Sequence, residues 1–276
     1  MSRPVPSADA AFYLPLAPAD DGSERFASTE HTVGPWSLAM QHMAPPSALL
    51  VRALERCSPR EGTRLVRVTL EVLGVVPRAD LTVRTSVVRP GRQIELLAAE
   101  LLATAPDGTE RAVVRAAGWR MAAHDTSGQV TAPDPVLAPV EDGVDVEPPE
   151  HWLPGYLDAL EWRWLEGFLD AQGRGEVWAR PRVQVVAGEE PTELQAAFAV
   201  IDSANGVGAP LDVREFTFLN TDLTVHLHRA PVGPWTGIAA ETSIGPDGVG
   251  TCSAVLHDSH GAFGRSAQIL LVRPRG

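Results

Sequence analysis

Two long stretches of the sequence carry the same succession of helix, strand and turn signals, which predicts one fold that has been duplicated and fused. The intervals 77–108 and 231–261 are almost equal in length, run from a proline to a glycine, and contain a glycine turn near the middle. The two copies then close on related short segments, in which Gly118 of the first copy corresponds to Gln268 of the second. A position at which duplicates diverge in this way is a candidate for function.

The first copy reads as one helix followed by strands. Pro45 and Pro46 open a segment whose apolar residues recur at helical spacing, and proline is tolerated in the first turn of a helix. We therefore expect a helix over residues 45–57. Strand-like runs follow, separated by turns that contain proline or glycine, over residues 65–76, 81–88, 94–104 and 111–121.

The second copy follows a linker. Residues 124–150 contain five prolines, several acidic residues and little periodicity, which indicates an extended connection. Beyond it, Trp162, Trp164 and Trp178 indicate early strands, and the segment from Thr192 to Gln195 fits the capping box that begins a helix. Further strands are expected over residues 216–228, 235–244, 250–257 and 263–272.

These patterns predict an α+β fold of two similar units. A long helix beside an antiparallel sheet has to pack on the inner face of that sheet as a second layer. We expect one unit over residues 1–123, the proline-rich linker over 124–150, and the second unit over 151–276. Side by side, the two sheets are able to join into one.

Composition restricts the partners. A formal charge of −12 argues against binding to nucleic acid, which requires a dense basic face. No apolar run reaches the ~18 residues that a membrane span requires, and the N-terminal residues lack the pattern of a signal peptide, so we expect a cytoplasmic protein without membrane contact. Cys57 and Cys252 lie in different halves and outside any metal-ligand pattern, which favours two buried apolar residues and no metal.

Asp202 is the most informative single residue. Leu194, Phe198 and Asp202 are spaced by four along the second helix, so the carboxylate shares a stripe with apolar residues and faces the core or a cleft. A buried carboxylate is costly unless it is paired or hydrogen-bonded. The alternative is that the helix unwinds after Ser203 and leaves Asp202 at a solvated end.

Four further polar residues are candidates for the same site. Gln268 lies in the last strand, where a neutral amide both donates and accepts hydrogen bonds without adding a charge to the sheet. Asn220, Thr221 and Thr224 fall on or near the strand after the second helix, and each is able to orient a water molecule. Threonine in a strand is also a common structural residue.

The order of these residues resembles the acyl-CoA thioesterase II (TesB-like) family. In the second half the likeness rests on Asp202, on the run from Asn220 to Arg229, and on Arg265 to Gln268. The first half adds short matches, which are Arg64-Leu65-Val66, Arg89-Pro90-Gly91 and the helix after Gln41-His42. The likeness covers about residues 25–122 and 175–273. It implies a double hotdog, in which each half wraps a curved antiparallel sheet around a central helix.

The resemblance also implies a catalytic set of an aspartate, a hydroxyl residue and a glutamine from the second half. Asp202 and Gln268 match this set, whereas the hydroxyl position falls on Asn220. Thr221 or Thr224 takes that role if the strand register differs. Where similar sequences have paired glycines at the start of the first helix, this chain has Met43-Ala44.

The reaction that this family resemblance implies is hydrolysis of an acyl-CoA or related thioester by an activated water, without a covalent intermediate or a cofactor. Asp202 is the general base or water anchor, and Gln268 and Asn220 orient the water. Backbone N–H groups at a helix end are the expected donors to the oxyanion. Double hotdogs of this kind pair further, so a homo-oligomer is expected.

Other activities stay open. A non-catalytic acyl-binding or accessory protein is favoured by Asn220 and Met43, and opposed by Asp202 and Gln268. Hotdog hydratases use an aspartate with a histidine five positions later, where this chain has Val207. His226 and His228 share a strand face and are conceivable metal ligands, but polar strand residues are the better interpretation.

Overall fold

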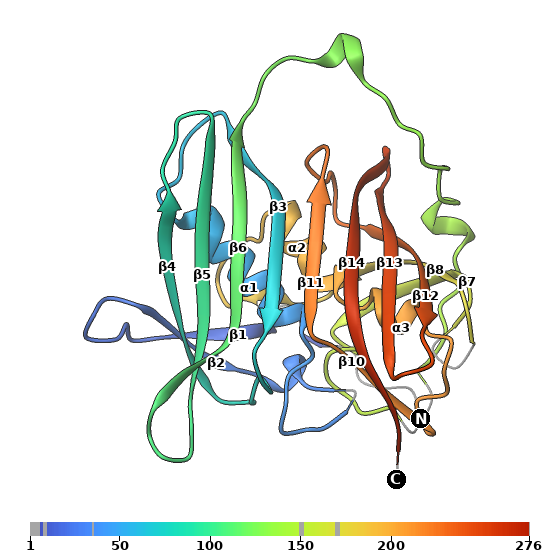
Figure 1. The fold of residues 1–276 in the computed structure, drawn as a ribbon, viewed down its shortest axis with the longest axis horizontal. Coiled ribbons are helices and arrows are strands. Elements are labelled where there is room, and N and C mark those ends of the chain that lie inside the picture. Colours follow the sequence, from blue (N-terminus) through green and yellow to red (C-terminus); the bar gives the residue numbers. More distant parts are fainter. Residues whose placement is uncertain (1–5, 8–9, 35, 149–151, 169–171, 276) are drawn as a thin grey trace.

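The computed structural model describes residues 6–7, 10–34, 36–148, 152–168 and 172–275. It confirms the expected double hotdog, in which each half holds a helix within a curved antiparallel sheet (Figure 1). The first half consists of β1 (Ala11–Leu16), β2 (Glu24–Ser28), η1 (Glu30–Thr32), α1 (Ala44–Arg56), β3 (Thr63–Val72), β4 (Asp80–Arg89), β5 (Ile94–Thr104) and β6 (Glu110–Ala122). The second half consists of β7 (Leu160–Glu166), β8 (Gly175–Pro181), β9 (Gln184–Val186), α2 (Glu193–Ile201), α3 (Ala204–Val207), β10 (Phe216–Asn220), β11 (Asp222–Leu227), β12 (Thr236–Ile244), β13 (Val249–Asp258) and β14 (Gly261–Pro274).

The two sheets join through β3 and β11 into one sheet of 14 strands. Thr69 pairs with Thr224, and the neighbours pair symmetrically about them, Val68 with Val225 and Leu70 with Leu223. The pseudo-two-fold axis of the duplication therefore passes between Thr69 and Thr224. This register brings the end of one helix close to the start of the other.

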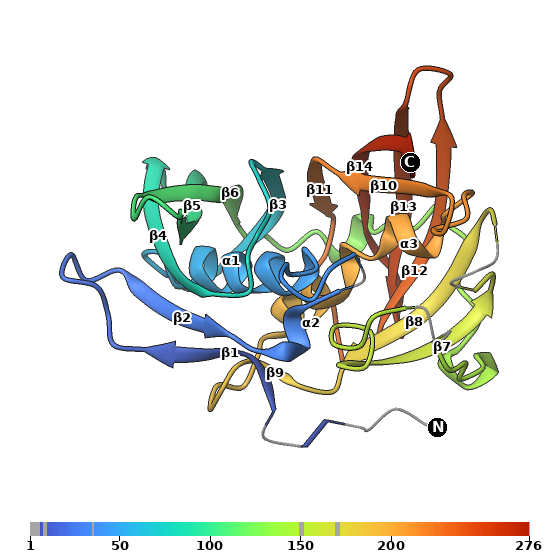
Figure 2. The same cartoon turned by 90° about the horizontal axis from the view of Figure 1, so that it is seen from below.

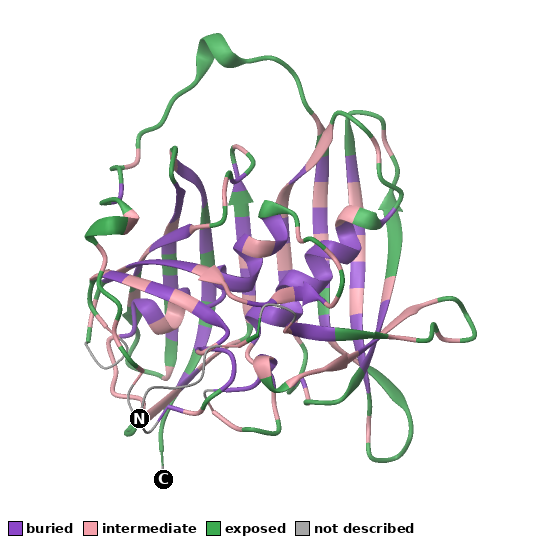
Figure 3. Ribbon diagram, turned by 180° about the vertical axis from the view of Figure 1, so that it is seen from behind, coloured by how far each residue is buried: buried purple, intermediate pink, exposed green. Residues whose placement is uncertain are grey.

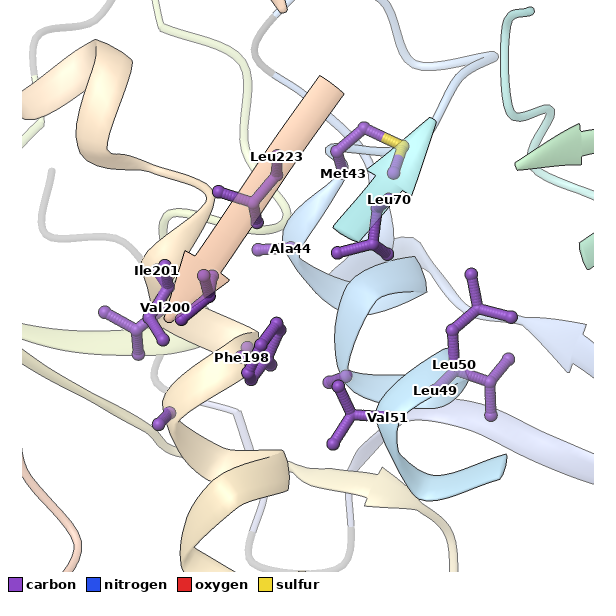
Figure 4. Packing of buried hydrophobic residues seen from close by; sticks show 14 of the residues in the cluster. Met43, Ala44, Leu49, Leu50, Val51, Leu70, Phe198, Val200, Ile201 and Leu223 are labelled. Atoms are coloured by element: carbon purple, nitrogen blue, oxygen red, sulfur yellow. The ribbon is translucent and has the colours of Figure 1, made fainter. Parts of the chain in front are cut away.

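The helices form the centre of the core because the sheet covers them on several sides. Figure 2 shows α1 between β3–β6 on one side and β1 and β2 on the other. Residues 44–54 of α1 are all buried, as expected of a helix that is enclosed rather than half solvated (Figure 3). The two helices pack against each other, and Phe198 of α2 points towards Val51 of α1 (Figure 4).

Several local predictions are corrected by the structure. Strands β1, β2 and β9 were not expected, and the predicted strand 65–76 ends at Val72. The predicted strand 216–228 is broken at Thr221 into β10 and β11. Thr192 does cap α2 by accepting from Gln195 N, but the Gln195 side chain donates to Glu55 of α1 at 2.7 Å instead of completing a capping box.

Between the halves, residues 123–148 contain two short 3-10 turns, η2 (Ser127–Gln129) and η3 (Val140–Asp142). This segment arches from the end of β6 to the far side of the second half (Figure 1). Cys57 and Cys252 are both buried and unpaired, as expected. Among the described residues, no helix combines the length and the apolar character that crossing a bilayer would need.

Candidate active site

Asp202 lies directly after α2 and is buried, with 2 % of its surface exposed. The helix does end at this residue, but the alternative of a solvated end is wrong, because α3 follows and packs against β8 and β12. That packing is close: a Cβ on Gly175 would meet the carbonyl oxygen of Val207 at 2.1 Å, and one on Gly208 would meet Ala240 at 2.8 Å. Glycine at these positions lets the segment of α3 pack directly on β8 and β12.

Two amides hold the Asp202 carboxylate in place. Asn220 Nδ2 donates to Asp202 Oδ1 at 2.8 Å, and Gln268 Nε2 donates to the same oxygen at 3.2 Å and to the Asp202 backbone carbonyl at 3.1 Å. Both donors therefore act on one carboxylate oxygen. The structure brings together Asp202, Asn220 and Gln268, three residues that are far apart in the sequence.

Burial sets the acidity of Asp202. Removal of the carboxylate from water raises its pKa from the ordinary 3.8 to about 7, although the hydrogen bonds from Asn220 and Gln268 act in the opposite direction. A carboxyl group with a pKa near 7 is able both to accept and to return a proton at neutral pH. Perturbed acidity of this kind is typical of catalytic carboxylates.

His42 and Tyr156 complete the surroundings of Asp202. His42 Nδ1 lies 3.6 Å from Asp202 Oδ2, and its ring stacks on Tyr156 with centroids 3.9 Å apart. Burial lowers the pKa of His42 to about 3, so the ring is neutral and the contact is no ion pair. Because Ala44 N–H donates to Nδ1 at 3.1 Å, the proton of the neutral ring belongs on Nε2.

Sequence reasoning placed His42 in a matched segment but gave it no part in the site, and it missed Tyr156. The hydroxyl of Tyr156 donates to Ala199 O at 2.9 Å and contacts Ser203 Oγ at 3.2 Å. It thus supports the turn that carries Asp202. The position of His42 just before the first helix could have identified it as a site residue. Tyr156 follows the linker in a segment without periodicity, so no sequence pattern pointed to it.

A cavity of about 180 Å³ lies beside this polar cluster and is open to solvent. Asp202, Asn220 and His42 line one part of it, and Asp202 and His42 are the only acidic or basic residues among the described lining residues. Most of the remaining wall is apolar, and its largest side chains are Trp36, Trp152, Trp162, Trp164 and Phe218. An apolar cavity with few polar groups is the usual form of a small-molecule site.

The two threonine candidates lie outside the cluster. Thr224 donates to Thr69 Oγ1 at 3.2 Å on the outer face of the sheet, and Thr221 is exposed with its hydroxyl 3.5 Å from Ile269 O. The break at Thr221 is stabilised by Asp222, which accepts from Ile269 N at 2.7 Å. Asn220 is therefore the member of this segment that reaches Asp202.

The start of α1 also lies beside Asp202, through His42, but it offers few free backbone donors. Pro45 and Pro46 have no N–H, and the N–H of Ala44 is engaged by His42. Of the backbone N–H groups expected as donors to the oxyanion, this helix start therefore offers that of Met43. His226, a conceivable metal ligand, is exposed, and no cluster of three metal-binding side chains occurs within the described ranges.

Comparison with known families gives two matches, one in each half of the chain. A family model described as the acyl-CoA thioesterase N-terminal domain matches residues 32–121, and one described as the acyl-CoA thioesterase C-terminal domain matches residues 138–272. Together they cover most of the chain. By sequence, no protein of curated function matches it.

Solved structures with a similar fold cover nearly the whole chain at low sequence identity. A hotdog-fold protein of unknown function from Alicyclobacillus acidocaldarius has a TM-score of 0.75 and 14% identity over 99% of this chain and 100% of that one. A protein proposed to be a thioesterase II from Thermobifida fusca has a TM-score of 0.70 and 14% identity over 99% and 100%. The acyl-CoA thioesterase II TesB2 from Mycobacterium marinum has a TM-score of 0.62 and 13% identity over 95% of both chains. At these identities the likeness shows the fold.

Proposed function

Because this chain belongs to the acyl-CoA thioesterase family, we propose that it hydrolyses acyl-CoA thioesters with a water molecule activated by Asp202. One observation carries the proposal. Two amides hold Asp202 Oδ1, and this carboxyl group, whose pKa is about 7, lines an apolar cavity that is large enough for an acyl group.

The proposed reaction needs no covalent intermediate. Asp202 accepts a proton as the water oxygen forms a bond to the thioester carbon. The tetrahedral intermediate then collapses, the carbon–sulfur bond breaks, and the protonated Asp202 returns its proton to the thiolate of coenzyme A. Free acid and free thiol are the products, and the carboxylate is regenerated.

The surrounding residues have distinct roles in this proposal. Asn220, whose Nδ2 is used by Asp202, offers its side-chain oxygen to the attacking water. Gln268 is a positioning residue, because both of its hydrogen bonds fix Asp202 rather than reach into the cavity. The oxyanion is met by the N–H of Met43 at the start of α1 and by the Nε2–H of the neutral His42.

The test is thiol release from a panel of acyl-CoAs, followed by a single turnover in ¹⁸O-labelled water with enzyme in excess. We expect free coenzyme A and one labelled oxygen in the acid formed in the first turnover. An unlabelled acid in that turnover would show that the Asp202 carboxylate attacks the carbonyl itself. Absence of thiol release from every acyl-CoA, with binding retained, would instead support the non-catalytic acyl-binding protein.

A further inference from the structure

The walls of the candidate cavity carry an unusual share of the aromatic residues of this chain. Four of the seven tryptophans, Trp36, Trp152, Trp162 and Trp164, line it together with Phe218. All except Trp36 are at most 7 % exposed, so their rings belong to the inner wall. Aromatic side chains of this kind are large, rigid apolar surfaces that favour offset or edge contacts with other rings.

The rings are fixed before any ligand arrives. Trp162 and Trp164 stack on each other with centroids 6.0 Å apart, and Trp162 Nε1 donates to Leu157 O at 3.0 Å. Trp36 meets Phe218 edge to face at 5.5 Å. Preorganised walls favour a guest of matching shape, because little side-chain freedom is lost on binding.

The size of the cavity restricts the guest further. Its volume of about 180 Å³ is close to the ~150 Å³ of an apolar protein cavity that holds benzene. A single ring with a short link to the carbonyl fills such a space. The tail of a long fatty acyl chain does not fit in it and has to extend into solvent, where it gains nothing from burial.

From these observations we propose that the site takes compact, ring-bearing acyl groups, of which an arylacetyl group is the simplest, in preference to linear fatty acyl chains. This inference rests on the proposed hydrolysis, and it places the carbonyl beside Asp202 and the ring among Trp152, Trp162 and Trp164. Each favourable ring contact raises kcat/KM about 2- to 12-fold over an aliphatic contact of the same area.

The decisive experiment compares three thioesters of equal carbon number. Phenylacetyl-CoA, cyclohexylacetyl-CoA and octanoyl-CoA all carry eight acyl carbons, and palmitoyl-CoA represents a long chain. We expect kcat/KM to fall in that order, with phenylacetyl-CoA about 10-fold or more above octanoyl-CoA. Equal or better turnover of octanoyl-CoA or palmitoyl-CoA would overturn the inference.

Variants locate the preference in the cavity. Trp162→Leu and the less buried Trp36→Leu are expected to bring the phenylacetyl-to-octanoyl ratio towards one while octanoyl-CoA is still hydrolysed. The control is Trp235→Leu, because Trp235 lies under Arg180 at 4.6 Å and does not line the cavity. An unchanged ratio in both cavity variants, or an equal fall in the control, would contradict the assignment.

Failure of the proposed hydrolysis can be distinguished from failure of the proposed preference for ring-bearing acyl groups. If no thioester in the set releases thiol, the proposed hydrolysis is wrong, but the ring preference is still measurable as quenching of tryptophan fluorescence by each acyl-CoA. Tighter binding of phenylacetyl-CoA than of octanoyl-CoA in that titration would support the ring-binding cavity. The reverse order would overturn it.

Discussion

The two halves of this protein share one backbone fold, but corresponding positions are polar in the second half and apolar in the first. In the second half, Asp202, Asn220 and Gln268 meet at the end of α2. In the first half, Gly118 occupies the strand position of Gln268, and a Cβ placed on it would meet Leu65 at 3.0 Å and Leu54 at 3.1 Å. Three polar residues in one copy thus correspond to a packed apolar contact in the other.

The cavities follow the same division. A second pocket lies at the opposite end of the helix pair, where the end of α1 meets the start of α2, and Leu65 and Leu227 line it together with Arg60 and Arg64. None of its described lining residues is aromatic. Duplication therefore produced two equivalent places for a site. The second pocket places the carboxylates of Glu55 and Glu193 among arginines, whereas the first places Asp202 beside an aromatic wall.

The largest expected effect comes from removing the carboxylate that we propose as the general base. Asp202→Asn should lower kcat/KM by about 10²- to 10⁴-fold, because the amide accepts no proton from water. Leu54→Met, at the corresponding place in the first half, conserves volume and should change the rate by less than about 2-fold. Thiol-release kinetics on both variants make the comparison, and equal losses would mean that the halves are not functionally distinct.

The same aspartate should cost stability in a pH-dependent way. Its pKa is about 7 in the folded protein and 3.8 in its ordinary environment, so the folded state keeps a proton that the unfolded state releases. The stabilisation that the folded state gains by holding this proton is fully present below pH 4 and is lost as the pH rises through 7. At pH 8 the Asp202→Asn variant should therefore exceed the wild type by up to about 4 kcal/mol in its free energy of unfolding.

Urea unfolding of the wild type and of Asp202→Asn at pH 4, 6 and 8 measures this difference. The gap between the two proteins should widen with pH. Leu54→Met serves as the uncharged reference and should run parallel to the wild type. A gap that narrows with pH would show that Asp202 is stabilised as a carboxylate, in conflict with its burial.

Placing a glutamine at the first-half position that corresponds to Gln268 should lower the stability of the protein without changing the rate of hydrolysis. Gly118→Gln places new atoms against Leu54 and Leu65, and overpacking of this kind costs about 1–3 kcal/mol. Thermal unfolding measures the loss, and kcat/KM at a temperature where the variant is folded should stay close to that of the wild type. An unaltered midpoint would mean that the first half keeps room for a polar cluster.

The smallest effect is expected at the junction of the halves. Thr224→Val removes one partly buried hydrogen bond to Thr69, worth about 1 kcal/mol or less, and should leave the rate within about 2-fold of the wild type. Asn220→Ala, by contrast, should reduce the rate about 10-fold or more by releasing Asp202. If the threonine variant loses as much activity as the asparagine variant, Thr224 and not Asn220 supports the reaction.

The sequence determined the duplication, the helices and most of the strands. Periodicity and turn residues are local, so α1 and the strands β4 to β6 were predicted within one or two residues of their observed ends. The stripe shared by Phe198 and Asp202 likewise predicted a buried carboxylate, which the structure has. Residues that belong to the same helix or strand show a regular spacing in the sequence, which can be recognised without knowing the fold.

Only the tertiary structure decided which polar residues meet. The family resemblance placed the third site position on Asn220 but left Thr221 and Thr224 open if the strand register differed. In the structure, the break after β10 turns Asn220 inward, and the register of β11 turns Thr224 outward. His42 and Tyr156 come from segments on either side of the linker, and their stacking beside Asp202 leaves no sequence pattern. Such contacts depend on strand register and on how two helices pack, which are properties of the whole fold rather than of any one segment.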